Sequence, residues 1–466
     1  MDFLIRIVLI VFSLLSIPQL IRWVAGWYRE GNFDASARFI LYVWGLNVVS
    51  WVAGRFLGGG YVEYGQYGES YSIAQGWVGS LERWSIPATI VLGLIRLTQI
   101  LRENRRLVLD RASVSALFVV LAGSIGALAV DNAQTSFRQV LLVVLLLVAA
   151  TTANGVKAIY GAAVAVWSLA IVSGLLLLVN ASQATRPCRF DKCGPMANLY
   201  RGIFENENAL GMALVMGLPF LVVASVDRKG RWIPLALVAL SAYTTGSRTS
   251  QIGLVAAVVT GAVWFVFRAG RQNSISRLLA KTVLVLAVPI TLVAQVWIVL
   301  SASNADYTNR AELWSWGLSR LQESWLFGIG WNALESFFTS TGGIAGASSY
   351  SLHNQFLDIL VIGGIFGISV FLLTLSVMLV RTIRGDMSLV LILVPMLSMG
   401  TLETPWSFGQ SDWLSWVMVA ALMASSTRSR STPWGVGFEG AGKSLLVSRS
   451  SPKALMGPTD VPDRKF

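Results

Sequence analysis

Residues 351–367 read SLHNQFLDILVIGGIFG, and the apolar run that begins inside this stretch continues to Val380. Between residues 356 and 380 the one charged side chain is Asp358. Such a run predicts a membrane-spanning helix, because about 20 apolar residues cross the hydrocarbon core of a bilayer. Glycines in such a helix allow a second helix to pack closely against it. Three lie within the run: Gly363, Gly364 and Gly367.

The composition of the whole chain predicts an integral membrane protein with many spans. Of its 466 residues 55% are hydrophobic and 13% are charged, against roughly 25% charged in soluble domains. The mean hydropathy is +0.64. Basic residues in cytoplasmic loops account for a formal net charge of +12. No basic and aromatic nucleic-acid motif stands out, so we expect a lipid bilayer and no nucleic acid as a partner.

Thirteen apolar stretches are candidate spans, and several are shorter than the ~20 residues that a perpendicular helix needs. They are 3–27, 38–56, 86–101, 113–130, 140–153, 156–179, 209–226, 232–246, 251–267, 278–300, 356–380, 388–402 and 413–424. The first lacks a small-residue cleavage site and is interpreted as a retained span. The sequence therefore predicts an all-α integral membrane protein with about 12–13 transmembrane helices. We expect one membrane domain at 1–425 and a disordered basic tail at 426–466.

Basic residues in the loops predict the orientation. Four loops are rich in arginine and lysine, at 102–111, 228–231, 268–281 and 381–384. Alternating spans place all four on one side, which the positive-inside rule makes cytoplasmic, together with the tail. The opposite side, periplasmic or exterior, then receives both cysteines, His353 and a long loop at 301–352.

The two cysteines, Cys188 and Cys193, lie together in RPCRFDKCGP. Two cysteines with this spacing can ligate a metal, but a site needs more ligands and the histidine is far away in sequence. A disulfide is the favoured alternative. It requires an oxidising exterior, in agreement with the expected orientation.

The long loop predicts one helix of its own. Asn309 is a suitable N-cap, and Glu312 at the third helical position completes a capping box. Trp314, Leu318 and Leu321 would then share an apolar face. This pattern predicts an amphipathic helix that lies on the outer membrane surface.

Two arginines on the predicted outer face, Arg248 and Arg310, are candidate ligands of an anion. Arg201 precedes a span, and Arg248 lies in a short turn between two spans, where a cation must snorkel, pair with an acid or bind an anionic ligand. Arg310 lies in the first turn of the predicted surface helix, where a cation opposes the helix dipole unless an anion lies between them. Ordinary ion pairing, for example of Arg310 with Asp306, is the alternative.

His353 is the only histidine in the chain and lies at the mouth of a predicted span. Histidine changes charge near neutral pH and is a candidate general base; an inert residue that anchors the helix end is the alternative. Two arginines and a histidine on one face suit inverting transfer to a hydroxyl, in which arginine neutralises a leaving pyrophosphate and histidine takes the proton. Outer-face carboxylates are few, so we expect no metal site and no cofactor.

In their order along the chain, RGIFENENALG, GSRTS, TNRAELWSWGLSRLQESWLFGIGWNALESF and HNQFLDILVIGGIFG resemble the O-antigen ligase and polymerase superfamily of bacterial membrane glycosyltransferases. The resemblance covers roughly residues 201–367. It implies a GT-C-like fold in the bacterial cytoplasmic membrane. It also implies metal-independent, inverting transfer of a glycan from an undecaprenyl-pyrophosphate-linked oligosaccharide donor to a glycan or glycolipid acceptor. In that family Arg248 and Arg310 would contact the pyrophosphate, and His353 would activate the acceptor.

Four further residues are candidates for substrate binding: Arg201, Asn208, Asn354 and Asp358. Glu207 departs from the family pattern, which commonly has lysine there. A lipid or polysaccharide transporter is the alternative function, and it predicts broken helices or ionisable residues near the membrane midplane. Ligases and polymerases differ in the acceptor, and these motifs do not distinguish them.

Overall fold

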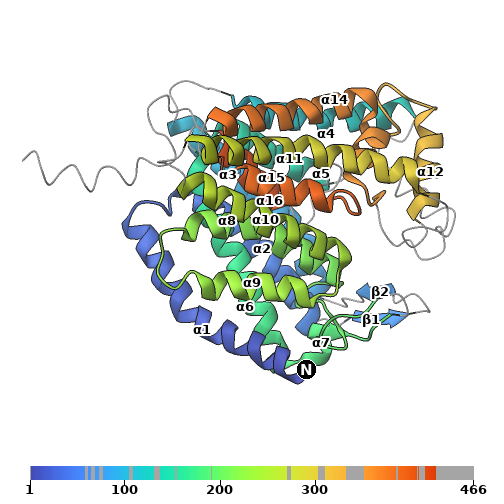
Figure 1. Cartoon of the computed structure of the whole chain (residues 1–466). Coiled ribbons are helices and arrows are strands. Elements are labelled where there is room, and N and C mark those ends of the chain that lie inside the picture. Colours follow the sequence, from blue (N-terminus) through green and yellow to red (C-terminus); the bar gives the residue numbers. More distant parts are fainter. Residues whose placement is uncertain are drawn as a thin grey trace, which may run out of the picture. The chain divides into compact units, whose positions relative to one another are not determined.

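A computed structural model describes residues 2–57, 61–64, 69–72, 77–103, 109–130, 137–152, 155–189, 192–269, 274–302, 310–331, 351–384, 387–406, 408 and 415–426. The chain divides into two units, Met1–Arg428 and Ser429–Phe466. The second unit, which makes up most of the predicted tail, lies outside the described residues. Every helix and strand below belongs to the first unit (Figure 1).

The protein is an all-α integral membrane protein, as the sequence predicts. Among the described residues, eight helices are long and apolar enough to cross a membrane. They are α1 (Asp2–Arg29), α3 (Trp77–Glu103), α4 (Arg111–Ala129), α6 (Ala158–Val179), α8 (Glu207–Ser225), α10 (Arg248–Ala269), α11 (Ser274–Ser301) and α14 (Gln355–Arg384). Four shorter apolar helices accompany them: α5 (Phe137–Thr151), α9 (Trp232–Thr244), α15 (Val390–Met399) and α16 (Ser415–Ser425). α2 (Ala35–Leu57) occupies the remaining predicted span.

Two short hairpins depart from the expectation of helices alone. β1 (Tyr61–Tyr64) pairs antiparallel with β2 (Glu69–Ser72), and β3 (Thr185–Arg186) pairs with β4 (Leu199–Tyr200). Strands of four and two residues are too short to produce a recognisable alternation of apolar and polar residues. The β3–β4 hairpin closes the segment that contains both cysteines.

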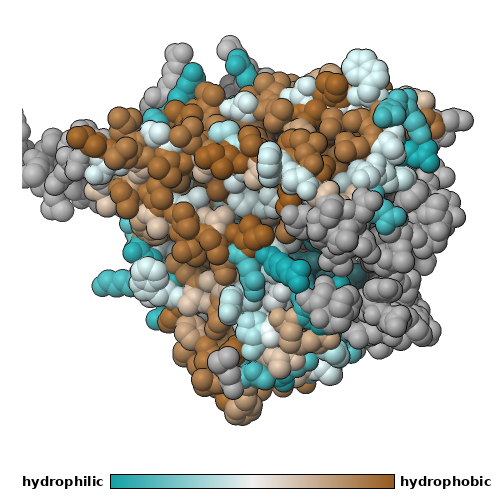
Figure 2. Space-filling model, turned by 45° about the vertical axis from the view of Figure 1, so that its right-hand side comes forward, coloured by the Kyte–Doolittle hydropathy of each residue, from teal (hydrophilic) through white to brown (hydrophobic). Residues whose placement is uncertain are grey.

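The centre of the bundle consists of helices that are apolar on all sides. α6, α8, α15 and α16 are buried along most of their length, as expected for helices without a polar face. α1, α10 and α11 instead expose large apolar side chains such as Leu15, Val255 and Leu286. Figure 2 shows such apolar surface over much of one face of the molecule. In a bilayer these outer side chains face lipid.

α14 is interrupted at Gly364, where the backbone leaves helical geometry with φ 65° and ψ −165°. The backbone of residues 325–330 fills the interruption, and four backbone hydrogen bonds join it to residues 361–366. A Cβ at Gly364 would lie 2.3 Å from the carbonyl oxygen of Leu326. Glycine is therefore required here both for its positive φ and for the close approach of a second backbone.

The other two glycines of this run confirm the prediction that a second helix packs against it. A Cβ at Gly363 or at Gly367 would lie 3.5 Å from the Cβ of Ala122 on α4. α4 and α14 pack along each other, so the small residues bring these two helices close together.

The predicted amphipathic helix exists as α12 (Arg310–Leu321), whereas its predicted cap, Asn309, lies outside the described residues. Its buried face differs from the prediction, because Trp314 is buried but Leu318 is 37% exposed. Tertiary packing explains the difference. Trp314 Nε1 donates to the carbonyl oxygen of Leu352 at 2.7 Å, and the side chain of Leu352 lies against Gly317.

Ion pairs gather the basic loops at one end of the bundle. These pairs are Arg381 with Asp110, Arg228 with Glu30, and Arg268 with Asp227. α7 (Ala181–Ala184), α12 and the β1–β2 hairpin lie at the other end (Figure 1). Because His353 lies there, between α12 and α14, we call it the histidine end.

Candidate active site

Buried side-chain amides hold the histidine end together. Gln295 of α11 is fully buried. Its Nε2 donates to the carbonyl oxygen of Leu397 at 2.6 Å, and its Oε1 accepts from the backbone N–H of Phe356 at 3.1 Å. Asn354 Nδ2 donates to the carbonyl oxygens of Gln295 (3.1 Å) and Thr401 (3.2 Å). These bonds tie α11, the start of α14 and the residues after α15 into one unit.

The segment that follows α15 is clamped to α14 a second time. Gln355 Nε2 donates to the carbonyl oxygen of Trp406 at 2.8 Å, and Gln355 Oε1 accepts from the Trp406 N–H at 2.6 Å. The backbone N–H of Gln355 donates to the carbonyl oxygen of Gly400 at 2.8 Å. Buried hydrogen bonds of this kind are costly to break. They hold Glu403 beside His353.

His353 has a backbone φ of 51°, a left-handed conformation that histidine adopts more often than most residues. Its Nδ1 lies 2.7 Å from Glu403 Oε2. Since a carboxylate only accepts, Nδ1 carries the hydrogen of the neutral imidazole and Nε2 keeps its lone pair. The imidazole is 20% exposed, so a ligand can reach it.

Glu403 also binds a cation. Arg310, the first residue of α12, donates from Nη2 to Glu403 Oε1 at 2.8 Å and from Nη1 to the carbonyl oxygen of Leu402. Its partner is thus Glu403, while Asp306, the alternative considered from sequence, lies outside the described residues. Burial alone would raise the pKa of Glu403, but His353 and Arg310 outweigh burial and lower this pKa to about 2. The carboxylate therefore stays ionised near neutral pH.

A second charged cluster adjoins Glu403 through Asn208. Asn208 Nδ2 donates to Glu403 Oε1 at 3.1 Å, and Asn208 Oδ1 accepts from Lys192 Nζ at 2.7 Å. Lys192 Nζ also donates to Glu207 Oε1 at 2.5 Å, and Glu207 Oε2 lies 2.6 Å from Arg186 Nη2. The side chain of Glu207 is 1% exposed. A continuous chain of polar contacts therefore runs from Arg186 to the histidine.

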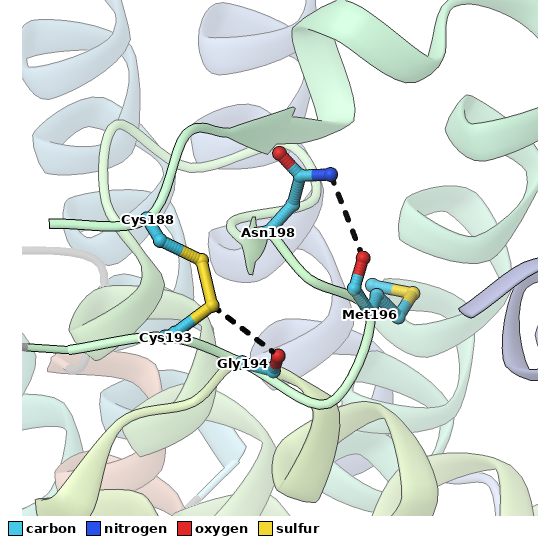
Figure 3. The surroundings of a disulfide bond; sticks show 5 residues. All are labelled: Cys188, Cys193, Gly194, Met196 and Asn198. Atoms are coloured by element: carbon cyan, nitrogen blue, oxygen red, sulfur yellow. Dashed lines mark hydrogen bonds between the residues drawn. A yellow bond between two sulfur atoms is a disulfide. The ribbon is translucent and has the colours of Figure 1, made fainter. Parts of the chain in front are cut away.

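Cys188 and Cys193 form a disulfide, the favoured one of the two alternatives derived from the sequence (Figure 3). Inside the loop that they close, the backbone N–H of Arg189 donates to Lys192 O at 2.9 Å, and the backbone N–H of Lys192 donates to Arg189 O at 3.2 Å. Gly194 follows, and a Cβ there would lie 2.4 Å from the carbonyl oxygen of Asn198. The cysteine loop, residues 188–193, of which 188, 189, 192 and 193 are described, is therefore closed at its base by the disulfide and by two backbone hydrogen bonds.

Arg248 is the first residue of α10 and is exposed. Gly246, just before it, has a φ of 71°. A Cβ at Gly246 would lie 2.8 Å from Gly194 Cα. The turn that presents Arg248 therefore rests on the residue that follows the cysteine loop.

Arg201 contacts the backbone of Gln183 and Ala184 in α7. Its residue is 4% exposed, and its Nε donates to the carbonyl oxygen of Gln183 at 3.2 Å. The backbone N–H groups of Arg201 and Gly202 both donate to the carbonyl oxygen of Ala184. Arg201 thus joins the end of the β3–β4 hairpin to α7.

Asn354 and Asp358 brace the backbone on either side of His353. Asn354 Oδ1 accepts from the backbone N–H of Leu357 at 3.0 Å and so caps α14. Asp358 Oδ1 accepts from the backbone N–H of Leu352 at 2.9 Å, and its residue is 4% exposed. These contacts hold the backbone that presents the imidazole.

Sequence reasoning missed the residue at the centre of the site. Glu403 lies 50 positions after His353, in the segment LETPW. The available signal was a carboxylate directly after an apolar span, on the side predicted for the histidine. Lys192 lies within the cysteine motif RPCRFDKCGP, which by itself predicts no role for the lysine. Among the described residues, no group of three or more His, Cys, Asp or Glu side chains is placed to hold a metal ion.

Comparison with known proteins places part of the chain in a family. Residues 233–372 match a family model described as O-antigen ligase. The matched range contains Arg248, Arg310 and His353; Glu403 and the cysteine loop lie outside it. No curated protein and no solved structure matches the chain.

Proposed function

Through residues 233–372 the chain belongs to the O-antigen ligase superfamily, and on that premise we propose that it transfers a glycan from undecaprenyl pyrophosphate to an acceptor hydroxyl. The transfer takes place at the outer face of the bacterial cytoplasmic membrane and serves surface polysaccharide assembly. One observation carries the proposal: His353 and Arg310 contact the two oxygens of the same carboxylate, that of Glu403. A base and an anion-binding group therefore lie side by side.

His353 acts as the general base. Because Glu403 accepts the hydrogen of Nδ1, Nε2 is left to take the proton of the acceptor hydroxyl. The imidazolium that forms is stabilised by the ionised carboxylate, which orients the ring and does not itself take the proton. General-base catalysis of this kind contributes typically about 10²–10⁴-fold to the rate.

Arg310 and Arg248 bind the leaving pyrophosphate. A guanidinium has five N–H donors in a planar fork that matches phosphate oxygens. The side chain of Arg310 is 19% exposed, and two of its donors reach Glu403 and Leu402. An anion can therefore approach its other donors. Arg248 is exposed at the start of α10, where the helix N-terminus adds partial positive charge.

The charges around Glu403 favour an anionic donor. Three cations and two carboxylates are joined by the contacts described above: Arg186, Lys192, Arg310, Glu207 and Glu403. With a neutral histidine the cluster carries an excess of positive charge, which attracts an anionic ligand.

In the proposed step the acceptor oxygen forms a bond to the anomeric carbon on the face opposite the pyrophosphate. The bond between that carbon and the pyrophosphate oxygen breaks, and its electron pair leaves with undecaprenyl pyrophosphate. The acceptor proton moves to His353 Nε2. The anomeric centre inverts, and the step is metal-independent because arginine stabilises the leaving charge.

A lipid or polysaccharide transporter is the second candidate, and the interruption of α14 at Gly364 is the observation that favours it. Discontinuous helices form the ion and substrate sites of many transporters. Here, however, the backbone of residues 325–330 bonds to the interrupted turns, and residues 359–367 contain no ionisable side chain. The charged cluster lies instead at the histidine end. These features support the enzyme over the transporter.

The experiment is glycan transfer by the purified protein in nanodiscs, with a lipid-linked oligosaccharide as donor. His353→Ala should bind the donor as the wild type does and transfer about 10²–10⁴-fold more slowly, and EDTA should leave the wild-type rate unchanged. Arg320→Ala is the control, since Arg320 pairs with Glu323 and both side chains are about half exposed. Full activity of His353→Ala would exclude the histidine base. Movement of the donor across the bilayer without transfer would identify a transporter.

A knockout examined for its surface glycan identifies the acceptor. A polymerase is identified by single repeats still attached to the final acceptor. A ligase is identified by intact long chains that remain on the lipid carrier.

A further inference from the structure

We propose that Lys192 in the cysteine loop is a positioning residue for the pair formed by His353 and Glu403, and that the disulfide between Cys188 and Cys193 keeps Lys192 in place. The inference rests on the proposed function, because it assigns a role within the same site. It concerns a segment that lies outside the family match at 233–372.

Lys192 is an ammonium held in a fixed place. Its side chain is 10% exposed, and its Nζ donates to Glu207 Oε1 at 2.5 Å and to Asn208 Oδ1 at 2.7 Å. Burial lowers the pKa of Lys192, while the adjacent Glu207 carboxylate opposes that effect. An ammonium has three N–H donors, and two of them are therefore engaged by the first two residues of α8.

Lys192 determines how the amide of Asn208 is oriented. Lysine can only donate, so the Asn208 oxygen must face Lys192, and Nδ2 then faces Glu403 Oε1 at 3.1 Å. In the reversed amide the oxygen would face the Glu403 carboxylate, and the two acceptors would repel each other. Lys192 thus acts on Glu403 through Asn208, and Glu403 in turn holds Nδ1 of the histidine.

The disulfide keeps Lys192 in reach of its partners. Lys192 directly precedes Cys193 inside the bridged loop, and Arg186 lies two residues before Cys188, so each cation is close in sequence to one of the bridged cysteines. Each contacts a different oxygen of Glu207, at 2.5 Å for Lys192 and 2.6 Å for Arg186. A lysine on an open loop would lose more conformational freedom on binding than one whose loop is already closed.

The cysteine loop also touches the element that carries an arginine of the site. Gly194, next to Cys193, packs on Gly246 in the turn before Arg248. Lys192 in the loop therefore reaches Glu403 through Asn208, and Gly194, the residue after the loop, packs on the turn before Arg248.

A lysine that only neutralises Glu207 would leave the pH dependence of transfer unchanged, whereas a lysine that acts on the histidine would shift it. Several charged or titratable groups are linked to His353 by the contacts described above: Glu403 after α15, Arg310 on α12, Asp358 on α14, and, through Asn208, the group of Lys192, Glu207 and Arg186. Lys192 interacts electrostatically with Glu403. Loss of its positive charge favours the protonated histidine. The acid limb, which is the fall in transfer rate at low pH, should therefore move to higher pH. Loss of the Glu207 charge should move that limb to lower pH.

The experiment measures transfer against pH for Lys192→Met, Lys192→Arg and Glu207→Gln in the full-length protein. Lys192→Met should transfer at least about 10-fold more slowly, the factor expected for one lost charge-assisted hydrogen bond, with its acid limb at higher pH. Lys192→Arg should recover most of the rate, and Glu207→Gln should shift the limb the opposite way. Lys157→Met is the matched control, because Lys157 Nζ donates to the carbonyl oxygen of Gly31 in an exposed contact elsewhere.

The disulfide is tested in parallel. Reduction of the wild type, or replacement of both cysteines by serine, should reproduce the slower rate and shifted limb of Lys192→Met, and reductant should not affect the serine variant. A folded Lys192→Met with the wild-type rate and limb would overturn the inference, and so would a slower rate with an unshifted limb. Should Lys192→Met elute as aggregate in size exclusion, the pH dependence of transfer by Lys192→Arg and Glu207→Gln tests the inference instead. An inactive wild type would instead reject the proposed function.

Discussion

Glu403→Gln is the substitution that tests the site most directly, because it removes the central charge and keeps the shape of the side chain. The carboxylate is 6% exposed and accepts from His353 Nδ1 at 2.7 Å, Arg310 Nη2 at 2.8 Å and Asn208 Nδ2 at 3.1 Å. An amide has a single acceptor oxygen, and its NH₂ group cannot accept. Glutamine therefore cannot satisfy the histidine on one side and the arginine on the other.

The magnitude follows from these contacts. A hydrogen bond to a charged group contributes about 1.5–3 kcal/mol, which corresponds to about 10- to 160-fold in rate if the bond orients the base. If the NH₂ group faces His353, the tautomer with hydrogen on Nε2 is favoured, and that tautomer cannot accept the proton. Exchange of an orienting carboxylate for an amide has cost about 10⁴-fold in a serine protease. We therefore expect transfer to fall by about 10²–10⁴-fold.

The pH dependence gives a second readout. Only the neutral imidazole accepts a proton, so wild-type transfer should fall as the pH decreases through the range where histidine becomes charged, between about pH 8 and about pH 5. The pKa of Glu403 is lowered from 4.5 to about 2, so its negative charge is present throughout this range and favours the imidazolium. Glu403→Gln removes that charge, and the acid limb of its residual activity should lie at lower pH.

The stability of the fold should depend on the ionisation of the Glu403 carboxylate. Because the pKa of Glu403 is lowered in the folded state, its stabilisation is complete above its ordinary value of 4.5 and is lost as the pH falls toward about 2. The thermal unfolding midpoint should fall more over this interval in the wild type than in Glu403→Gln.

The assay is single-turnover transfer from a lipid-linked donor, with donor binding measured separately. Glu323→Gln is the matched control, because Glu323 pairs with Arg320 and is 48% exposed. If Glu403→Gln transfers at the wild-type rate, Glu403 does not orient the base and the proposed site is wrong.

Two further outcomes are expected. Arg248→Ala and Arg310→Ala should each nearly abolish transfer at normal expression, and lysine at either position should restore little, because a point charge does not reproduce a bidentate fork; normal transfer by either alanine variant would show that this arginine does not bind pyrophosphate. Gly364→Ala should lower the free energy of unfolding by about 1–3 kcal/mol, because φ is 65° and the new Cβ would lie 2.3 Å from the carbonyl oxygen of Leu326. Its thermal unfolding midpoint is to be compared with that of Gly45→Ala, where a Cβ meets nothing within 4 Å, and equal midpoints would contradict this reasoning.

Hydropathy alone predicted most of the fold. Each span is a local run of apolar residues, and a helix satisfies its own backbone hydrogen bonds, so no distant partner is needed to recognise it. The interruption of α14 could not be derived in this way. The Gly363–Gly364 pair predicts close packing, but the break depends on the backbone of residues 325–330, which bonds to residues 361–366 from a separate part of the chain.

For the candidate site as well, some residues could be predicted from the sequence and others only from the tertiary structure. The sequence by itself predicted the histidine, the arginines and the cysteine pair as candidates, because a lone histidine, a cation between spans and two cysteines five positions apart are unusual in a local window. Only the tertiary structure decided that Glu403 joins His353 to Arg310 and that Lys192 reaches Asn208. The physical reason is that charge pairing depends on distance in space: 50 positions separate Glu403 from His353, and 93 separate it from Arg310. No periodicity in the sequence encodes such contacts. The buried amides of Gln295, Asn354 and Gln355 hold the segment that contains Glu403 against the start of α14, next to His353.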